Sequence, residues 1–212
     1  MAGDALDSLF MQNRLNVNFG ANIKYRLPLS ENILKMPSTI ADRLNKPSQI
    51  VHLKERATYE FIKEIEKCTV SAADKEKVNR LFVLIEDQQI FSFFEEIEKT
   101  KKALSTHTKV PFEFQYPDIE TSDSFTAFEF EQWAHAFKTE VFQALDRCFE
   151  MAGVQKTQID QVFLTGGTAH VPFIQKEFVA MFGSEKLQTK RHFHAIVSGL
   201  IESAKYWNEF SH

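Results

Sequence analysis

Residues 162–172 constrain the fold of this chain more than any other segment. A short apolar run ends at Gly166 and Gly167, and Pro172 follows at a position typical of the first turn of a helix. Glycine allows positive φ and lets the backbone pass close to a ligand. A strand, two glycines and a helix N-terminus together suit a phosphate or ribose-phosphate group. An ordinary tight strand-to-helix turn has the same pattern, so the segment alone does not decide the function.

Composition excludes several classes of protein. The 212 residues are 43% hydrophobic, enough for one large domain or two small ones. Lysine and arginine number 25 against 29 acids, and a net charge of −4 argues against nucleic-acid and anionic-membrane partners. The acidic N-terminus does not resemble a signal peptide, and no apolar run reaches membrane-spanning length. Cys68 and Cys148 lack metal-type spacing, which indicates a reduced, cytoplasmic protein. Cys148 lies on an apolar helical stripe, which predicts a place in the core.

Hydrophobic periodicity predicts a helix-rich first part with one β-hairpin. Ser71 is expected to cap a helix, and Pro28, Pro37 and Pro47 favour short helices and loops between residues 16 and 49. The expected helices cover residues 4–15, 50–67, 74–85 and 88–105, and the expected strand pair covers residues 110–115 and 119–126. Most of the 21 phenylalanines recur at helical spacing, which predicts that they lie in the core.

The second part alternates helix and strand, as layered α/β units do. Gly153 and Gly183 are expected to end helices. The expected elements are a long helix over residues 128–151, a buried strand over 160–165, a helix over 172–182, a short strand over 187–189 and a last helix over 193–207. We therefore expect two subdomains, a helix-rich one over residues 1–127 and the C-terminal part of an α/β subdomain over residues 128–212.

The expected helix over residues 88–105 has two neighbouring stripes. At about 100° per residue, apolar side chains form one stripe that packs inward. Glu98, Lys101, Lys102 and Ser105 form the other stripe, at the rim of any cleft beside the helix. Lysine stems there can flank an aromatic base while Glu98 and Ser105 hydrogen-bond to ring or sugar atoms. A solvated helix face with ion pairs explains the same pattern, and without further information it is the better explanation.

Several segments together resemble the seventy-kilodalton heat-shock (DnaK-type) chaperones. Residues 98–105, EKTKKALS, are similar to the family's E-x-x-K-[KR]-x-L-S helix. Residues 2–7, AGDALD, resemble its G-G-D-D-F-D helix start, and residues 126–131, TAFEFE, resemble T-R-x-x-F-E. Residues 164–172, LTGGTAHVP, resemble V-G-G-S-T-R-I-P. Residues 193–204 resemble the closing helix, most closely that of the YegD-like branch.

The resemblance implies an α/β fold of the actin-like ATPase type, of which this chain corresponds to the second lobe. The first lobe with its phosphate loop and catalytic lysine, and the substrate-binding domain, have no counterpart in the sequence. We therefore expect a fragment of a longer chaperone, natural or engineered, with Met1 as an introduced start. The intact protein is expected to bind ATP and ADP with Mg²⁺. The expected partners are the nucleotide, the missing lobe and a co-chaperone or exchange factor.

The resemblance also implies which residues bind the nucleotide. Four residues would contact the adenosine of ATP, namely Glu98, Lys101, Lys102 and Ser105. Four more would lie on its ribose-phosphate side or near the base, namely Gly166, Gly167, Thr168 and His170. His170 stands in place of a family arginine and lacks its guanidinium. Ala127 replaces another arginine, and Arg191 and His192 replace acids. We expect neither a catalytic residue nor a metal ligand in this chain.

Two other functions remain open at this stage. One is a small-molecule kinase fragment of the actin-like superfamily, which would share the glycine turn but lack the helix of residues 98–105. The other is an interaction module that has lost nucleotide binding and uses its helical part to dock a partner. His170, Ala127 and the missing acids near Arg191 keep the second alternative open.

Overall fold

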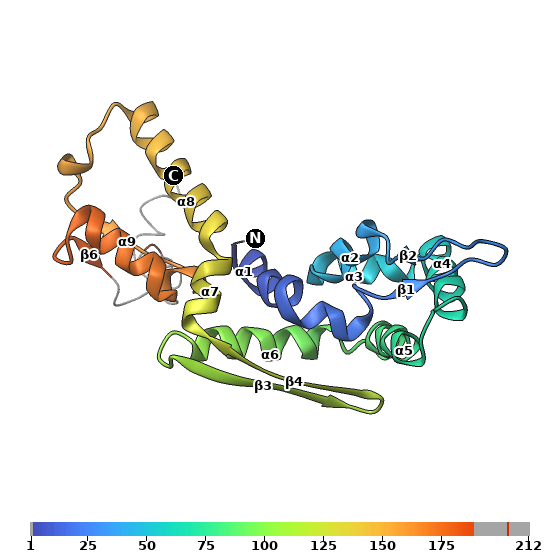
Figure 1. The fold of residues 1–212 in the computed structure, drawn as a ribbon. Helices are drawn as coiled ribbons and strands as arrows, with labels where there is room; N and C mark the ends of the chain where they lie inside the picture. Colours follow the sequence, from blue (N-terminus) through green and yellow to red (C-terminus); the bar gives the residue numbers. More distant parts are fainter. Residues whose placement is uncertain (1, 189–202, 204–212) are drawn as a thin grey trace. The chain divides into compact units, whose positions relative to one another are not determined.

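The computed structural model describes residues 2–188 and residue 203, and it divides into two compact units, residues 1–135 and 136–212 (Figure 1). The first contains short and long helices, α1 (Ala2–Phe10), α2 (Ser38–Leu44), α3 (Pro47–Ile50), α4 (Arg56–Lys67), α5 (Ala72–Glu86), α6 (Ile90–Ala103) and α7 (Ala127–Trp133). Its strands are β1 (Lys24–Tyr25), β2 (Leu34–Lys35), β3 (Lys109–Tyr116) and β4 (Ile119–Thr126).

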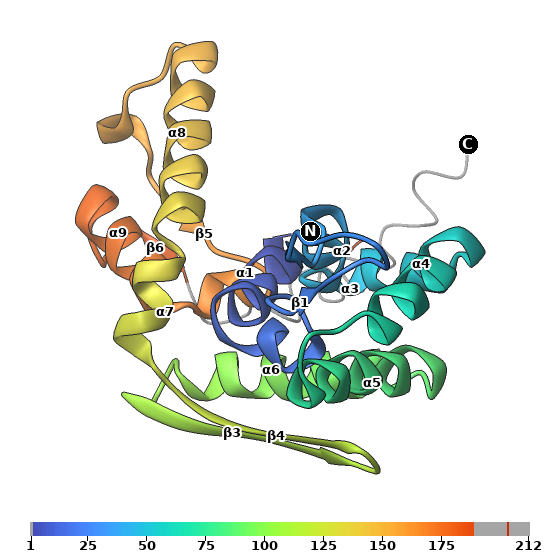
Figure 2. The ribbon, with the colours of Figure 1, turned by 45° about the vertical axis from the view of Figure 1, so that its right-hand side comes forward.

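The core of the first unit forms where α6 packs on the hairpin of β3 and β4 (Figure 2). The strands are antiparallel and paired from Lys109 with Thr126 to Tyr116 with Ile119. Phe93 of α6 is fully buried, and its ring lies 5.0 Å from that of Phe19 and 4.9 Å from that of Phe114. Rings at these separations pack edge to face, which adds to the burial of apolar area. The predicted helix over 88–105 and the predicted hairpin are both confirmed.

Two predicted helices of the first unit are interrupted. The α-helix from the N-terminus ends at Phe10 and continues as a π-helix, Met11–Leu15, and a 3₁₀ turn, Asn16–Phe19. The predicted helix over residues 50–67 is wrong as one element, because a 3₁₀ turn, Val51–Lys54, precedes α4 and Glu55 is not helical. Leu53 and Ile62 are both fully buried. Nine residues apart, they would face opposite sides of one straight helix, so the break brings both into the core.

Helix starts and turns in the first unit follow local rules. The Ser71 hydroxyl accepts a hydrogen bond from the Asp74 amide, which confirms the predicted cap of α5. Thr126 and Glu129 bond reciprocally at the start of α7 and form a capping box. The hairpin of β3 and β4 turns through Pro117 and Asp118, and Asp118 has a φ of 64°. Aspartate tolerates this left-handed conformation better than most residues.

The described part of the second unit contains the helices α8 and α9 and a small parallel sheet. Its elements are α8 (His135–Ala152), 3₁₀ turns at Lys156–Gln158 and Gly167–His170, β5 (Val162–Phe163), α9 (Pro172–Phe182) and β6 (Leu187–Gln188). β5 pairs with β6 in parallel. The helix predicted over 172–182 is confirmed, with Pro172 in its first turn and Gly183 after its end. Apart from Ser203, the predicted helix over 193–207 lies outside the described residues, as do the replaced residues Arg191 and His192.

Three predictions for this part of the chain are wrong. The helix predicted over 128–151 is two helices, because Ala134 leaves helical geometry between α7 and α8. The predicted buried strand over 160–165 is two residues long, and Phe163 in it is 67% exposed. Cys148, on a stripe that reads as core, is exposed. Phenylalanines are not uniformly buried either, since the side chains of Phe61, Phe91, Phe128 and Phe163 are exposed. Among the described residues, no helix is long and apolar enough to cross a membrane.

Candidate functional site

The first group of expected site residues lies at the C-terminal half of α6. Glu98, Lys101 and Lys102 are in the helix, and Ser105 follows its end, with its amide donating to the Lys102 carbonyl at 3.1 Å. The neighbouring apolar stripe is buried, as Ile97 and Leu104 show. The structure therefore places three of the four polar residues on one helix and Ser105 just after its end, beside the core and not in it.

Lys101 and Lys102 differ in their surroundings although they are adjacent. The Lys102 ammonium lies 2.9 Å from a Glu98 carboxylate oxygen, and these side chains are 64% and 47% exposed. The hydrogen bond from Lys102 is the main cause that lowers the pKa of Glu98. The Lys101 ammonium instead donates to Asp7 Oδ1 of α1 at 2.6 Å, and both side chains are only 13% exposed. Lys102 thus makes a pair within the helix, whereas Lys101 joins two helices.

Asp7, the partner of Lys101, is not among the eight residues expected to bind the nucleotide. It lies between Leu6 and Phe10, both fully buried, so α1 is held firmly against its neighbours. Burial is the main cause that raises the pKa of the Asp7 carboxyl, while the bond and charge of Lys101 act in the opposite direction. The charges of Glu98 and Asp4 raise that pKa further. The sequence pattern that could have identified Asp7 is an acidic residue between two apolar positions of a short helix.

The second group of expected site residues lies at the turn between β5 and α9. Gly166 has φ 84° and ψ 169°, a conformation that is essentially confined to glycine. Gly167, Thr168 and His170 belong to the 3₁₀ turn that follows, and the Gly166 carbonyl accepts from the Ala169 amide at 3.1 Å. Among the described residues, a Cβ added at Gly166 or Gly167 would meet no atom within 4 Å. The turn therefore leaves open space beside its backbone, as a bound ribose or phosphate requires.

The start of α9 strengthens this arrangement. Val171 precedes Pro172, and no side chain caps the helix. An uncapped helix N-terminus carries partial positive charge and attracts anionic groups. The second group of residues belongs to the second unit and the first group to the first unit. Each group of expected residues therefore lies within one unit.

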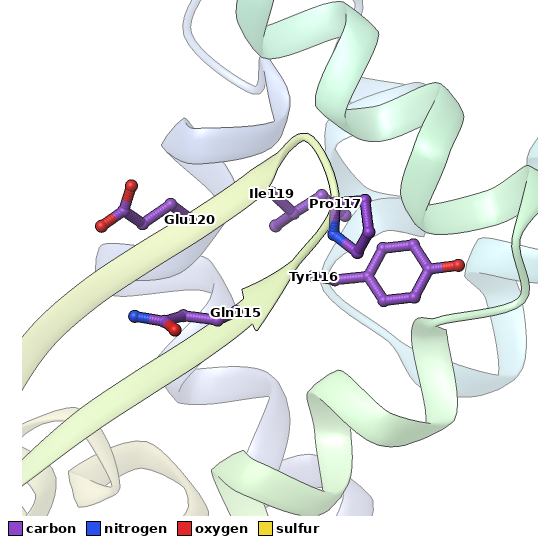
Figure 3. A pocket seen from close by; sticks show the side chains of 5 residues that line it. All are labelled: Gln115, Tyr116, Pro117, Ile119 and Glu120. Carbon is purple, nitrogen blue, oxygen red and sulfur yellow. The ribbon is translucent and has the colours of Figure 1, made fainter.

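A pocket of the described chain lies at the turn of the hairpin and is lined by Gln115, Tyr116, Pro117, Ile119 and Glu120. Figure 3 shows the Gln115 amide and the Glu120 carboxylate on one side of the ribbon and the Tyr116 ring on the other. This pocket contains none of the eight expected residues. It offers no pair of groups suited to acid–base or phosphate chemistry.

Magnesium has no assigned place in this chain. Within residues 2–188, no cluster of three or more histidine, cysteine, aspartate or glutamate side chains is arranged to hold a metal ion. The eight expected residues supply two ammonium groups, two hydroxyls, a carboxylate, an imidazole and the backbone of a glycine turn, groups that can hydrogen-bond to a nucleotide. None of the roles assigned to them depends on the metal.

Comparison with known proteins defines the class and then the family. The described structure is mainly helical with small sheets, consistent with a fragment of an actin-like α/β fold. A family model described as Hsp70 protein matches residues 63–200, more than half of the chain. The chain belongs to the Hsp70 family. The predicted fold class is thereby confirmed, and the matched segment includes both groups of expected residues.

Relatives among curated proteins agree with the family. A heat shock protein homolog of Naumovozyma castellii is 30% identical over 104 residues, 48% of this chain and 15% of that protein. A ribosome-associated molecular chaperone of Eremothecium gossypii is 30% identical over 95 residues, 43% of this chain and 15% of that protein. A heat shock protein of Neurospora crassa is 29% identical over 104 residues, 48% of this chain and 15% of that protein. The matches thus span about 15% of the length of these relatives. They support the family and give no support to the YegD-like branch.

Proposed function

We propose that this chain is the nucleotide-binding second lobe of an Hsp70-type chaperone and supplies the adenosine side of an ATP and ADP cleft. The observation that carries the proposal is the polar stripe of α6, in which four residues of the EKTKKALS segment lie together beside a buried apolar stripe. The family match over residues 63–200 supports it, because it includes this helix and the glycine turn. The assignment of residues 1–127 and 128–212 to two subdomains of that lobe remains part of the proposal.

The proposed roles follow the chemistry of each group. Lysine stems flank the base, while a carboxylate and a hydroxyl accept and donate hydrogen bonds to ring and sugar atoms. The glycine turn offers backbone amides and the positive end of α9 to the ribose-phosphate side. The residues concerned are Glu98, Lys101, Lys102 and Ser105 for the adenosine, and Gly166, Gly167, Thr168 and His170 for the ribose-phosphate side and the base.

This lobe alone is not expected to hydrolyse ATP. Phosphoryl transfer needs positioned metal ions and clamps on the transferred phosphate, and the expected nucleotide residues supply only the adenosine and ribose sides. We expect no magnesium-dependent phosphate release above buffer when the chain is incubated with ATP. Clear turnover that scales with protein concentration would contradict this division of roles.

Substitutions in both groups of expected residues test the proposal. Calorimetric titration with ADP should show weaker binding after Lys101→Ala and after Gly167→Val, because one removes a base-flanking stem and the other fills the open space at the turn. Glu96→Gln, at an exposed pair with Lys99 on the same helix, is the matched control and should leave the affinity unchanged. Affinity that ignores both Lys101→Ala and Gly167→Val would favour an interaction module that has lost nucleotide binding.

A further inference from the structure

The ion pair between α1 and α6 has no part in the roles assigned above. Three lysines project from the last turns of α6, and each has a carboxylate partner. Lys99 and Lys102 pair with acids of their own helix, and their side chains are 56% and 64% exposed. Lys101 pairs with Asp7, 94 residues away in sequence, and its side chain is 13% exposed. The third pair is therefore a contact between elements and is shielded from water.

We propose that Asp7 is a positioning residue of the nucleotide site, which holds the Lys101 ammonium so that the lysine stem lies against the bound base. The inference rests on the function proposed above. A free lysine side chain samples many rotamers, and fixing it in one of them costs conformational entropy. The contact with Asp7 meets this cost before the ligand arrives, as preorganised sites do.

The position of Asp7 suits this role because its own backbone is anchored. Leu6 and Phe10 are fully buried on either side of it, and the Phe10 ring packs at 5.0 Å from those of Phe125 and Phe130. The carboxylate is therefore carried by a rigid helix. Without it, the ammonium would be left in a poorly hydrated place, and the lysine would turn toward water.

A labelling experiment tests the contact without any nucleotide. The full chain is exposed briefly to an amine-acetylating reagent, and the extent of modification at each lysine is measured by mass spectrometry. Lys101 should react more slowly than Lys99 and Lys102 in the wild type. Asp7→Asn should raise the reactivity of Lys101 about ten-fold or more and leave Lys99 and Lys102 unchanged. Equal reactivity of Lys101 in both proteins would overturn the inference.

A double-substitution cycle tests the consequence for binding. Asp7→Asn should weaken ADP binding about ten-fold, equivalent to about 1.4 kcal/mol, and Asp7→Glu should restore part of the loss. In a Lys101→Ala background, Asp7→Asn should change the affinity little, since its effect acts through the lysine. A further loss of the same size in that background would overturn the inference, because it would mean that Asp7 supports the fold alone.

The two arms separate this inference from the proposed function. Failure of the wild-type chain to bind ADP would refute the proposed function and, with it, the role of Asp7 at a nucleotide site. Binding by the wild type with no loss in Asp7→Asn would refute only the role of Asp7. Thermal unfolding of every variant identifies any protein that has failed to fold. If Asp7→Asn does not fold, the ADP affinity of Asp7→Glu is compared with that of the wild type instead.

Discussion

The two units of this chain differ in how far the side chains of their helices and strands are buried. In the first unit, phenylalanines from a helix and a hairpin meet in one buried cluster that includes Phe93, Phe112 and Phe125. In the second unit, α8 extends over 18 residues and buries no side chain completely. The strands of that unit have two residues each and Phe163 is exposed, whereas Phe173, Ile174 and Phe182 of α9 are buried. Hydrophobic periodicity alone therefore does not distinguish a buried helix face from an exposed one.

The largest expected effect is on the cluster of the first unit. Phe93→Ala should lower the free energy of unfolding by about 3–5 kcal/mol, because it leaves a cavity among four other rings. Phe142→Ala of α8, whose half-buried ring lies 5.2 Å from that of Phe178, should cost about 1 kcal/mol. Urea unfolding followed by circular dichroism measures both. Equal losses would break the distinction between the units.

A backbone effect sharpens the comparison within the second unit. Gly166→Ala should destabilise by about 1–3 kcal/mol, because alanine at φ 84° and ψ 169° is strained although the space is open. Gly167→Ala, which also meets open space and has no positive φ, should be nearly neutral. The same unfolding assay compares the two variants. A neutral Gly166→Ala would mean that the turn relaxes in solution.

The capping box of α7 gives a smaller and pH-dependent effect. The hydrogen bond from Thr126 is the main cause that lowers the pKa of Glu129, so its stabilisation is present above the ordinary pKa of 4.5. That stabilisation should be lost as the pH falls through the lowered pKa of the folded protein. Thr126→Ala should cost about 1 kcal/mol at neutral pH. Glu129→Gln should flatten the acid limb of the stability profile, and an unchanged limb would remove Glu129 from the explanation.

The smallest effect on stability is expected at the exposed pair of α6. Lys102→Ala should change the free energy of unfolding by less than about 0.5 kcal/mol, since both partners are largely in water. It should nevertheless weaken ADP binding if Lys102 contacts the adenosine. Parallel unfolding and titration separate the two roles. A loss of stability that matches the loss of affinity would assign Lys102 to the fold.

Much of the first unit could be predicted from the sequence because its signals are local and agree with one another. Ser71 caps α5 as expected, and the strands around Pro117 and Asp118 form the expected hairpin. The polar stripe of α6 was also predictable, since four residues at helical spacing adjoin an apolar stripe. The resemblance named the family correctly at its coarse level, because several weak motifs occurred in the right order.

The failures concern tertiary contacts. The break at Glu55 allows both Leu53 and Ile62 to be buried. The helical period of the sequence does not predict such a break. Cys148 and Phe163 read as core residues because an apolar stripe looks the same whether or not a partner covers it. The contact of Asp7 with Lys101 could not be predicted, because the two residues are 94 positions apart. Spacing rules for helices concern only residues within a few turns of one another.

The central claim is that the polar stripe of α6 and the glycine turn bind adenosine nucleotides. Calorimetric titration of the full chain with ADP, with GTP as the control, tests it most directly. We predict saturable binding of ADP, weak because one lobe is measured, and no heat with GTP at the same concentration. Equal binding of both nucleotides, or no heat and no thermal stabilisation with ADP at millimolar concentration, would contradict the claim.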